Sequence, residues 1–136
     1  MGHLRFIIFY VLCGIAAVMA QALPDADSVV PMIGASGAIS GVLGAYLLLY
    51  PRARVTIIVP ILIIIKTFKV PAMFVLGGWF VMQLVSSAMA GSSDGGGVAF
   101  GAHIGGFIAG MVLVYFFKRR DVPLQIPFLH FHPWKS

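Results

Sequence analysis

The chain has 136 residues, of which 60% are hydrophobic and only 10% are charged, and its mean hydropathy is +1.03. A soluble domain is about half apolar and about a quarter charged, so this composition excludes a soluble globular protein and indicates an integral membrane protein. The single cysteine, Cys13, lies in an apolar segment and excludes a disulfide framework.

Four segments are apolar over close to the length of about 20 residues that a membrane-spanning helix needs. They cover residues 6–23, 33–50, 70–90 and 101–117, and proline, glycine or charged residues follow each of them. We therefore predict an all-α membrane protein, a polytopic bundle of four transmembrane helices within a domain of residues 1–120. The tail, residues 121–136, is expected to be cytoplasmic.

The segment 55–65 is the hardest to place. It is strongly apolar but has only eleven residues, contains Pro60, and is followed by Lys66 and Lys69. This length favours an interfacial apolar loop or a partly buried hairpin between two spans over a fifth crossing.

The distribution of charge predicts the orientation. With four crossings, every lysine and arginine falls on the side of the two termini, whereas Asp25, Asp27 and Asp94 fall on the other side. By the positive-inside rule, the side with the basic residues is the cytoplasm. The net charge of +5 thus follows from membrane topology, and we expect a lipid bilayer, not nucleic acid, as the partner.

Two polar residues, Ser36 and His103, stand near the starts of the segments 33–50 and 101–117. In the predicted topology both segments run inward from the outer face, so the two residues lie at similar depth. Taken alone, a serine in a membrane helix is often a packing residue that bonds the carbonyl four residues back. A histidine in lipid is costlier and more often functional, and the shared depth favours a pair.

Glycines indicate that these two segments approach each other closely. Gly37-x-x-x-Gly41 and Gly106-x-x-x-Gly110 give each helix a face of small residues, and Gly44 extends the first face. Such faces let helix backbones pack tightly in lipid. The two polar residues lie on or beside these stripes at 3.6 residues per turn.

A hydroxyl and an imidazole are the parts of a nucleophile and base pair. A serine hydroxyl is a weak nucleophile until a base takes its proton, and a histidine within about 3 Å can do so. Backbone N–H groups at a helix start suit the oxyanion that forms. Other schemes fit less well: Ala38 breaks the G-x-S-x-G pattern, HExxH is absent, and His130 and His132 in the tail are not expected to bind metal.

Three stretches, 34–41 (GASGAISG), 50–55 (YPRARV) and 101–107 (GAHIGGF), resemble the rhomboid intramembrane serine proteases. The opening residues 2–14 are similar to the third transmembrane helix of that family, and the likeness extends to about Lys118. The resemblance implies a protease without a cofactor that cleaves transmembrane segments of other proteins, near the outer face of the plasma membrane in bacterial members.

Carried onto this chain, the resemblance makes Ser36 the nucleophile and His103 the general base. The Ser36 N–H would donate to the oxyanion, Gly34 and Gly37 would keep the turn compact, and the loop 91–100 would act as a mobile cap.

The chain departs from the family pattern in two ways. The family core has six helices, of which only the last four are recognised here, and the missing pair carries a His-x-x-x-Asn motif that supports the oxyanion. This chain contains no asparagine, so we expect a truncated form with little or no activity on its own. Some members also have a tyrosine that packs on the histidine, where this chain has Ser40, so other contacts must orient His103.

Two further hypotheses stay open. The chain could be a non-catalytic rhomboid-like protein that binds membrane helices, although such a protein has no need to keep both Ser36 and His103. It could also be a small channel or transporter subunit in which these residues line a proton path, although no charged residue lies mid-span to relay protons.

Overall fold

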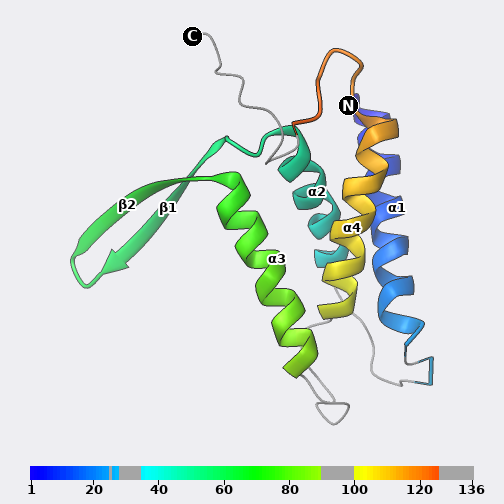
Figure 1. Cartoon of the computed structure of the whole chain (residues 1–136), viewed down its shortest axis with the longest axis horizontal. Helices are drawn as coiled ribbons and strands as arrows, with labels where there is room; N and C mark the ends of the chain where they lie inside the picture. Colours follow the sequence, from blue (N-terminus) through cyan, green and yellow to red (C-terminus); the bar gives the residue numbers. More distant parts are fainter. Residues whose placement is uncertain (25, 28–34, 90–99, 126–136) are drawn as a thin grey trace.

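The computed structural model describes residues 1–24, 26–27, 35–89 and 100–125, in which four helices and one two-stranded sheet occur. The elements in chain order are α1 (His3–Ala22), α2 (Ser36–Leu49), β1 (Arg54–Ile61), β2 (Ile64–Pro71), α3 (Ala72–Met89) and α4 (Phe100–Phe117) (Figure 1). The prediction of a polytopic helical membrane protein is confirmed, and the sheet is an addition to the all-α class.

Three helices are long and apolar enough to cross a membrane: α1 with 20 residues, and α3 and α4 with 18 each. Helix α2 is apolar as well but has 14 residues. The expected span 33–50 is therefore represented by a shorter helix, and its first two residues lie outside the described part of the chain. The described residues thus hold three candidate spans, one fewer than the four that the sequence predicts. Three spans still make the chain a multi-pass membrane protein.

Helix α4 contacts all three other helices. Helices α2 and α4 start at the same end of the molecule and run side by side, whereas α1 runs antiparallel to both, and α3 stands on the side away from α1 (Figure 1). Phe9, Cys13, Ala45, Leu48 and Val114 form the buried apolar cluster between α1, α2 and α4.

The backbones of α2 and α4 touch directly at glycines. A Cβ added at Gly106 would overlap the carbonyl oxygen of Gly37, and one added at Gly110 would overlap that of Gly41. Only glycine permits this approach, because any other residue places a Cβ where the facing backbone lies. The contact continues at Gly44, which faces the carbonyl group of Phe107.

The second side of α2 packs as tightly against α1. A Cβ added at Gly37 would lie 2.6 Å from the Cβ of Ala17, and one added at Gly41 would lie 2.5 Å from the Cβ of Cys13. These two glycines therefore serve both interfaces, and α2 is held between small residues of α1 and the backbone of α4.

A β-hairpin connects α2 to α3 and pairs Arg54 with Pro71 at its open end. The expected loop 55–65 is thus part of a longer element: it covers all of β1 except Arg54, the turn, and the first two residues of β2. Residues 70 and 71, assigned to the third helix by their apolar character, also belong to β2. The base is fixed by two backbone bonds: Ala72 N–H donates to Ala53 O at 2.7 Å, and Met73 N–H donates to Pro51 O at 2.8 Å.

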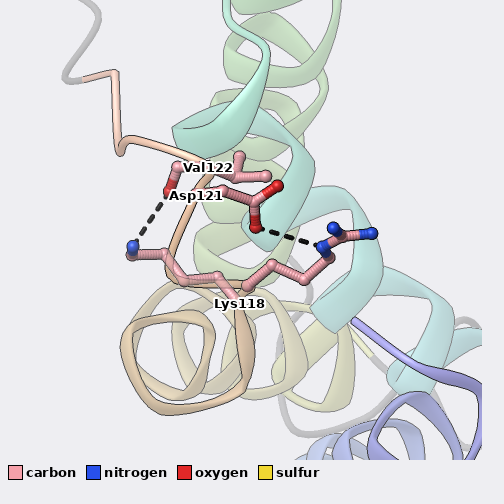
Figure 2. Close-up of polar contacts among 4 residues, drawn as sticks. Lys118, Asp121 and Val122 are labelled. Carbon is pink, nitrogen blue, oxygen red and sulfur yellow. Dashed lines mark hydrogen bonds and ion pairs between the residues drawn. The ribbon is translucent and has the colours of Figure 1, made fainter.

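Basic side chains bind backbone and acidic groups at the end of α4 (Figure 2). Lys118 Nζ donates to Val122 O at 2.9 Å, and Arg119 Nε donates to Asp121 Oδ1 at 3.1 Å. The hydrogen bond from Arg119 holds the pKa of the Asp121 carboxyl below its ordinary value. Arg5 Nη2 donates to Phe116 O at 2.8 Å, so a cation from α1 binds a carbonyl in the last turn of α4, where the helix dipole favours positive charge.

Gly110→Ala is expected to destabilise the bundle, because the added Cβ overlaps the backbone of Gly41 and overpacking a close contact costs about 1–3 kcal/mol. The matched control is Gly77→Ala in α3, where an added Cβ meets no atom within 4 Å. Thermal unfolding in detergent micelles measures both variants. Equal unfolding temperatures would contradict a direct contact between the two backbones.

Candidate active site

Ser36 is the first residue of α2, and its side chain is exposed. A packing serine in a helix typically donates its hydroxyl to the carbonyl four residues back. Ser40, one turn later, makes this hydrogen bond: its buried Oγ donates to Ser36 O at 2.8 Å. The hydroxyl of Ser36 instead lies against the imidazole of His103. The two serines of this helix face thus have different surroundings.

His103 lies in the first turn of α4, and its Nε2 is 3.0 Å from Ser36 Oγ. The two residues are 67 positions apart in sequence. They meet because α2 and α4 start at the same end and touch along the glycine stripe (Figure 1). Ser36 immediately precedes Gly37, and His103 lies three residues before Gly106, so the pair stands beside the first backbone contact between the helices.

The other ring nitrogen of His103 is bound by α3. Gln83 Oε1 lies 2.8 Å from His103 Nδ1, and the Gln83 side chain is buried, with 5% of its surface exposed. An amide oxygen only accepts hydrogen bonds, so Nδ1 carries the ring proton and donates it. In the neutral ring, Nε2 is then the unprotonated nitrogen and accepts a hydrogen bond from the Ser36 hydroxyl.

An aromatic side chain of α3 also contacts the imidazole. The ring centroids of Trp79 and His103 are 5.7 Å apart at an interplanar angle of 42°. Trp79 is in turn 6.1 Å from the ring of Phe107, which stacks on Phe80 at 4.5 Å. The position of the family's tyrosine is Ser40 in this chain, and the histidine is oriented by Gln83 and Trp79 instead.

The start of α4 is also tied to α1. Gln21 Oε1 accepts a hydrogen bond from the backbone N–H of Ala102 at 3.1 Å. This N–H belongs to the first helical turn, where no intrahelical acceptor exists. The residue before it is Gly101, where an added Cβ would lie 2.7 Å from the same amide oxygen. His103 is therefore held on a helix start that α1 caps.

Sequence reasoning missed both glutamines, although a signal for them was present. Gln21 and Gln83 are amides within otherwise apolar helices, and such side chains in membrane helices usually bond to a neighbouring helix. The partners could not be read from sequence, because they depend on how α1 and α3 are rotated about their axes.

Several expected features lie outside the described residues. These are Gly34, most of the loop 91–100 proposed as a cap, and the tail histidines His130 and His132. Within the described residues, no group of three or more His, Cys, Asp or Glu side chains could hold a metal ion.

A model of the rhomboid domain matches residues 1–120 of the sequence, which is most of the chain. The chain belongs to the rhomboid family. That family includes serine proteases, and the resemblance noted in the sequence is confirmed over the same region. No curated protein and no solved structure matches the rhomboid chain closely enough to be reported as a relative.

Nitrogen-15 labelling of histidine tests the ring geometry by magnetic resonance. In the wild-type chain, neutral His103 is expected to carry its proton on Nδ1, because Gln83 accepts it. Gln83→Leu removes the acceptor and should shift His103 toward the Nε2-protonated tautomer that free histidine prefers, whereas Gln83→Glu keeps an acceptor and serves as the control. His103→Gln identifies the signal. An Nε2-protonated ring in the wild type would contradict this arrangement.

Proposed function

We propose that this rhomboid chain is an intramembrane serine endopeptidase that hydrolyses peptide bonds in the transmembrane segments of other membrane proteins. The observation that carries the proposal is the 3.0 Å distance between Ser36 Oγ and His103 Nε2. This distance allows direct proton transfer between the two atoms. The buried Gln83 on Nδ1 supports the proposal, because it keeps Nε2 free to act as the base.

In the acylation step, His103 Nε2 takes the proton of the Ser36 hydroxyl while Oγ attacks the carbonyl carbon of the scissile bond. The tetrahedral intermediate carries its negative charge on the former carbonyl oxygen. His103 then gives the same proton to the leaving amine nitrogen, the C–N bond breaks, and the acyl group remains esterified to Ser36.

In the deacylation step, His103 takes a proton from water, whose oxygen attacks the ester carbonyl. Collapse of the second intermediate returns the proton to Ser36 Oγ and releases the carboxylic acid. The first-turn N–H groups of α2, that of Ser36 among them, would donate to both oxyanions, and Gly34 and Gly37 would keep that turn compact.

The position of the pair fits a substrate that lies in the membrane. Ser36 and His103 stand at the starts of their helices, at the opposite end from the hairpin and the basic turn after α4 (Figure 1). If the basic end faces the cytoplasm, hydrolysis occurs near the outer face of a bacterial plasma membrane, with both termini inside. Ser36 is exposed, so the aqueous phase at that face would supply the water for deacylation.

Covalent labelling with a fluorophosphonate, followed by in-gel fluorescence, tests the nucleophile. Ser36→Ala should abolish labelling, and His103→Ala should lower its rate by about 10²–10⁴-fold, because that is the usual contribution of a general base. The control is Ser87→Ala, an exposed serine on α3. Label that persists in Ser36→Ala would contradict the proposal. A wild-type chain that binds a transmembrane peptide but takes no label would favour the non-catalytic rhomboid-like function.

Gln83 is expected to act as a positioning residue, and its test is cleavage of a transmembrane substrate in proteoliposomes, with enough protein and time to follow the low activity that the absence of asparagine predicts. Gln83→Leu should lower kcat by about 10–100-fold with little change in KM, because a misplaced base costs up to about 10² in rate. Gln83→Glu keeps an acceptor for His103 Nδ1 and should recover much of that loss. Equal losses in the two variants, or an effect confined to KM, would contradict this role.

A further inference from the structure

The β1–β2 hairpin exposes apolar side chains that the described part of the molecule does not cover. Each strand has eight residues, and none of them is buried. Leu62 and Ile63, which form the turn, are 98% and 96% exposed. A two-stranded hairpin is marginally stable by itself in water, and aliphatic side chains stabilise a structure mainly through burial. This element therefore needs a surface to pack on.

The strand register makes the hairpin amphipathic. Side chains alternate between faces along a strand, and directly opposed residues share a face. The apolar face carries the pairs Val55–Val70, Ile57–Phe68, Val59–Lys66 and Ile61–Ile64. The opposite face, called the basic face, carries the pairs Arg54–Pro71, Thr56–Lys69, Ile58–Thr67 and Pro60–Ile65. Its two charges lie in the half near the base, and its far half toward the tip is largely apolar. Lys66 is the one charge on the apolar face, and its aliphatic stem allows the ammonium to reach a polar layer.

The turn is unusual for a hairpin in water. Leu62 has φ of 53°, in the left-handed region that favours glycine or asparagine, and tight hairpin turns commonly use those residues. The chain instead places two large aliphatic side chains at its most exposed point. A hairpin tip made of two aliphatic side chains is stable when those side chains are in an apolar environment, such as lipid acyl chains.

The hairpin also lies at the end of the molecule that carries positive charge. It leaves from the end of the molecule where α2 ends and α3 begins, where the chain following α4 also lies. It extends outward from the helices beyond α3, and its tip inclines toward the level of that helix (Figure 1). Arg54 and Lys69 flank its base, and Lys118 and Arg119 follow α4 at the same end. Basic residues beside an apolar surface match the chemistry of an anionic membrane surface.

We propose that the hairpin docks on the bilayer leaflet nearest the termini, with its apolar face and tip toward the acyl chains and its basic face among anionic headgroups. The outer edges of both strands have unpaired backbone groups, and open edges do not occur in the hydrocarbon region. The backbone of the strands is therefore expected in the hydrated headgroup layer, whereas the side chains of the apolar face and of the tip, which inclines toward the level of α3, enter the hydrocarbon.

Lipid quenching of fluorophores on neighbouring residues of opposite faces tests this placement. Phe68→Cys and Thr67→Cys, each combined with Cys13→Ala, carry the fluorophore on the apolar and basic faces, and Leu62→Cys reports the tip. The protein is reconstituted in phosphatidylcholine with or without phosphatidylglycerol and with doxyl-labelled lipids. The probes at 68 and 62 should be quenched several-fold more strongly than the probe at 67. Phosphatidylglycerol should increase the quenching at 68, and Lys69→Glu should reduce that increase.

Three results would overturn the proposal. Equal quenching at 67 and 68 would mean that the two faces do not differ in depth. An unquenched probe at 68 would mean that something other than lipid covers the apolar face. If the cysteine at 68 also crosslinks between molecules, the cover is a second copy of the chain. If it does not crosslink, the cover is another part of the same chain. Quenching that is indifferent to phosphatidylglycerol would exclude binding of anionic headgroups by the basic face.

Discussion

The direct contact between the backbones of α2 and α4 is the constraint on which the site depends. The carbonyl oxygen of Gly37 lies where a side chain of Gly106 would begin, so the separation of the two helices is set by backbone atoms. Ser36 and His103 flank this contact, and their 3.0 Å distance follows from it. A hydrogen bond weakens within a few tenths of an ångström, so a single methyl group added at the helix contact would weaken the hydrogen bond between Ser36 and His103.

Helix α3, the third helix that contributes to the site, is held against His103 in a different way. Helix α3 reaches His103 through side chains, the amide of Gln83 and the ring of Trp79, without a glycine contact of the kind that joins α2 and α4. Its start is anchored to the carbonyl groups of Pro51 and Ala53 at the base of the hairpin. The distance between Ser36 and His103 is thus fixed by packed backbones, whereas the tautomer of His103 depends on where α3 stands.

The sequence allowed prediction of the helical segments, their orientation and their close approach, because these depend on apolar periodicity, charge and glycine spacing. The distribution of charge across four segments predicts that Ser36 and His103 lie at one depth, and the glycine spacing predicts that their helices approach closely, whereas their roles come from family resemblance. The hairpin was harder, because strand pairing depends on a partner and its turn, Leu62-Ile63, lacks the glycine or asparagine that marks such turns. The partner of Gln83 could not be predicted, because periodicity does not give the rotation of one helix against another.

The two ends of the molecule differ in charge, and the proposed chemistry requires this. Proton transfer from Ser36 makes the imidazole of His103 a cation, which nearby positive charges would destabilise by about 4 kcal/mol at 4 Å and an effective dielectric constant of about 20. The basic residues that follow α4 are separated from His103 by most of an 18-residue helix, about 25 Å at 1.5 Å per residue, where the same repulsion falls to about 0.7 kcal/mol. The amide oxygen of Gln83 meets the charged ring as an acceptor. A neutral hydrogen-bond partner thus supports both protonation states of the base, so the site needs no carboxylate within the described helices.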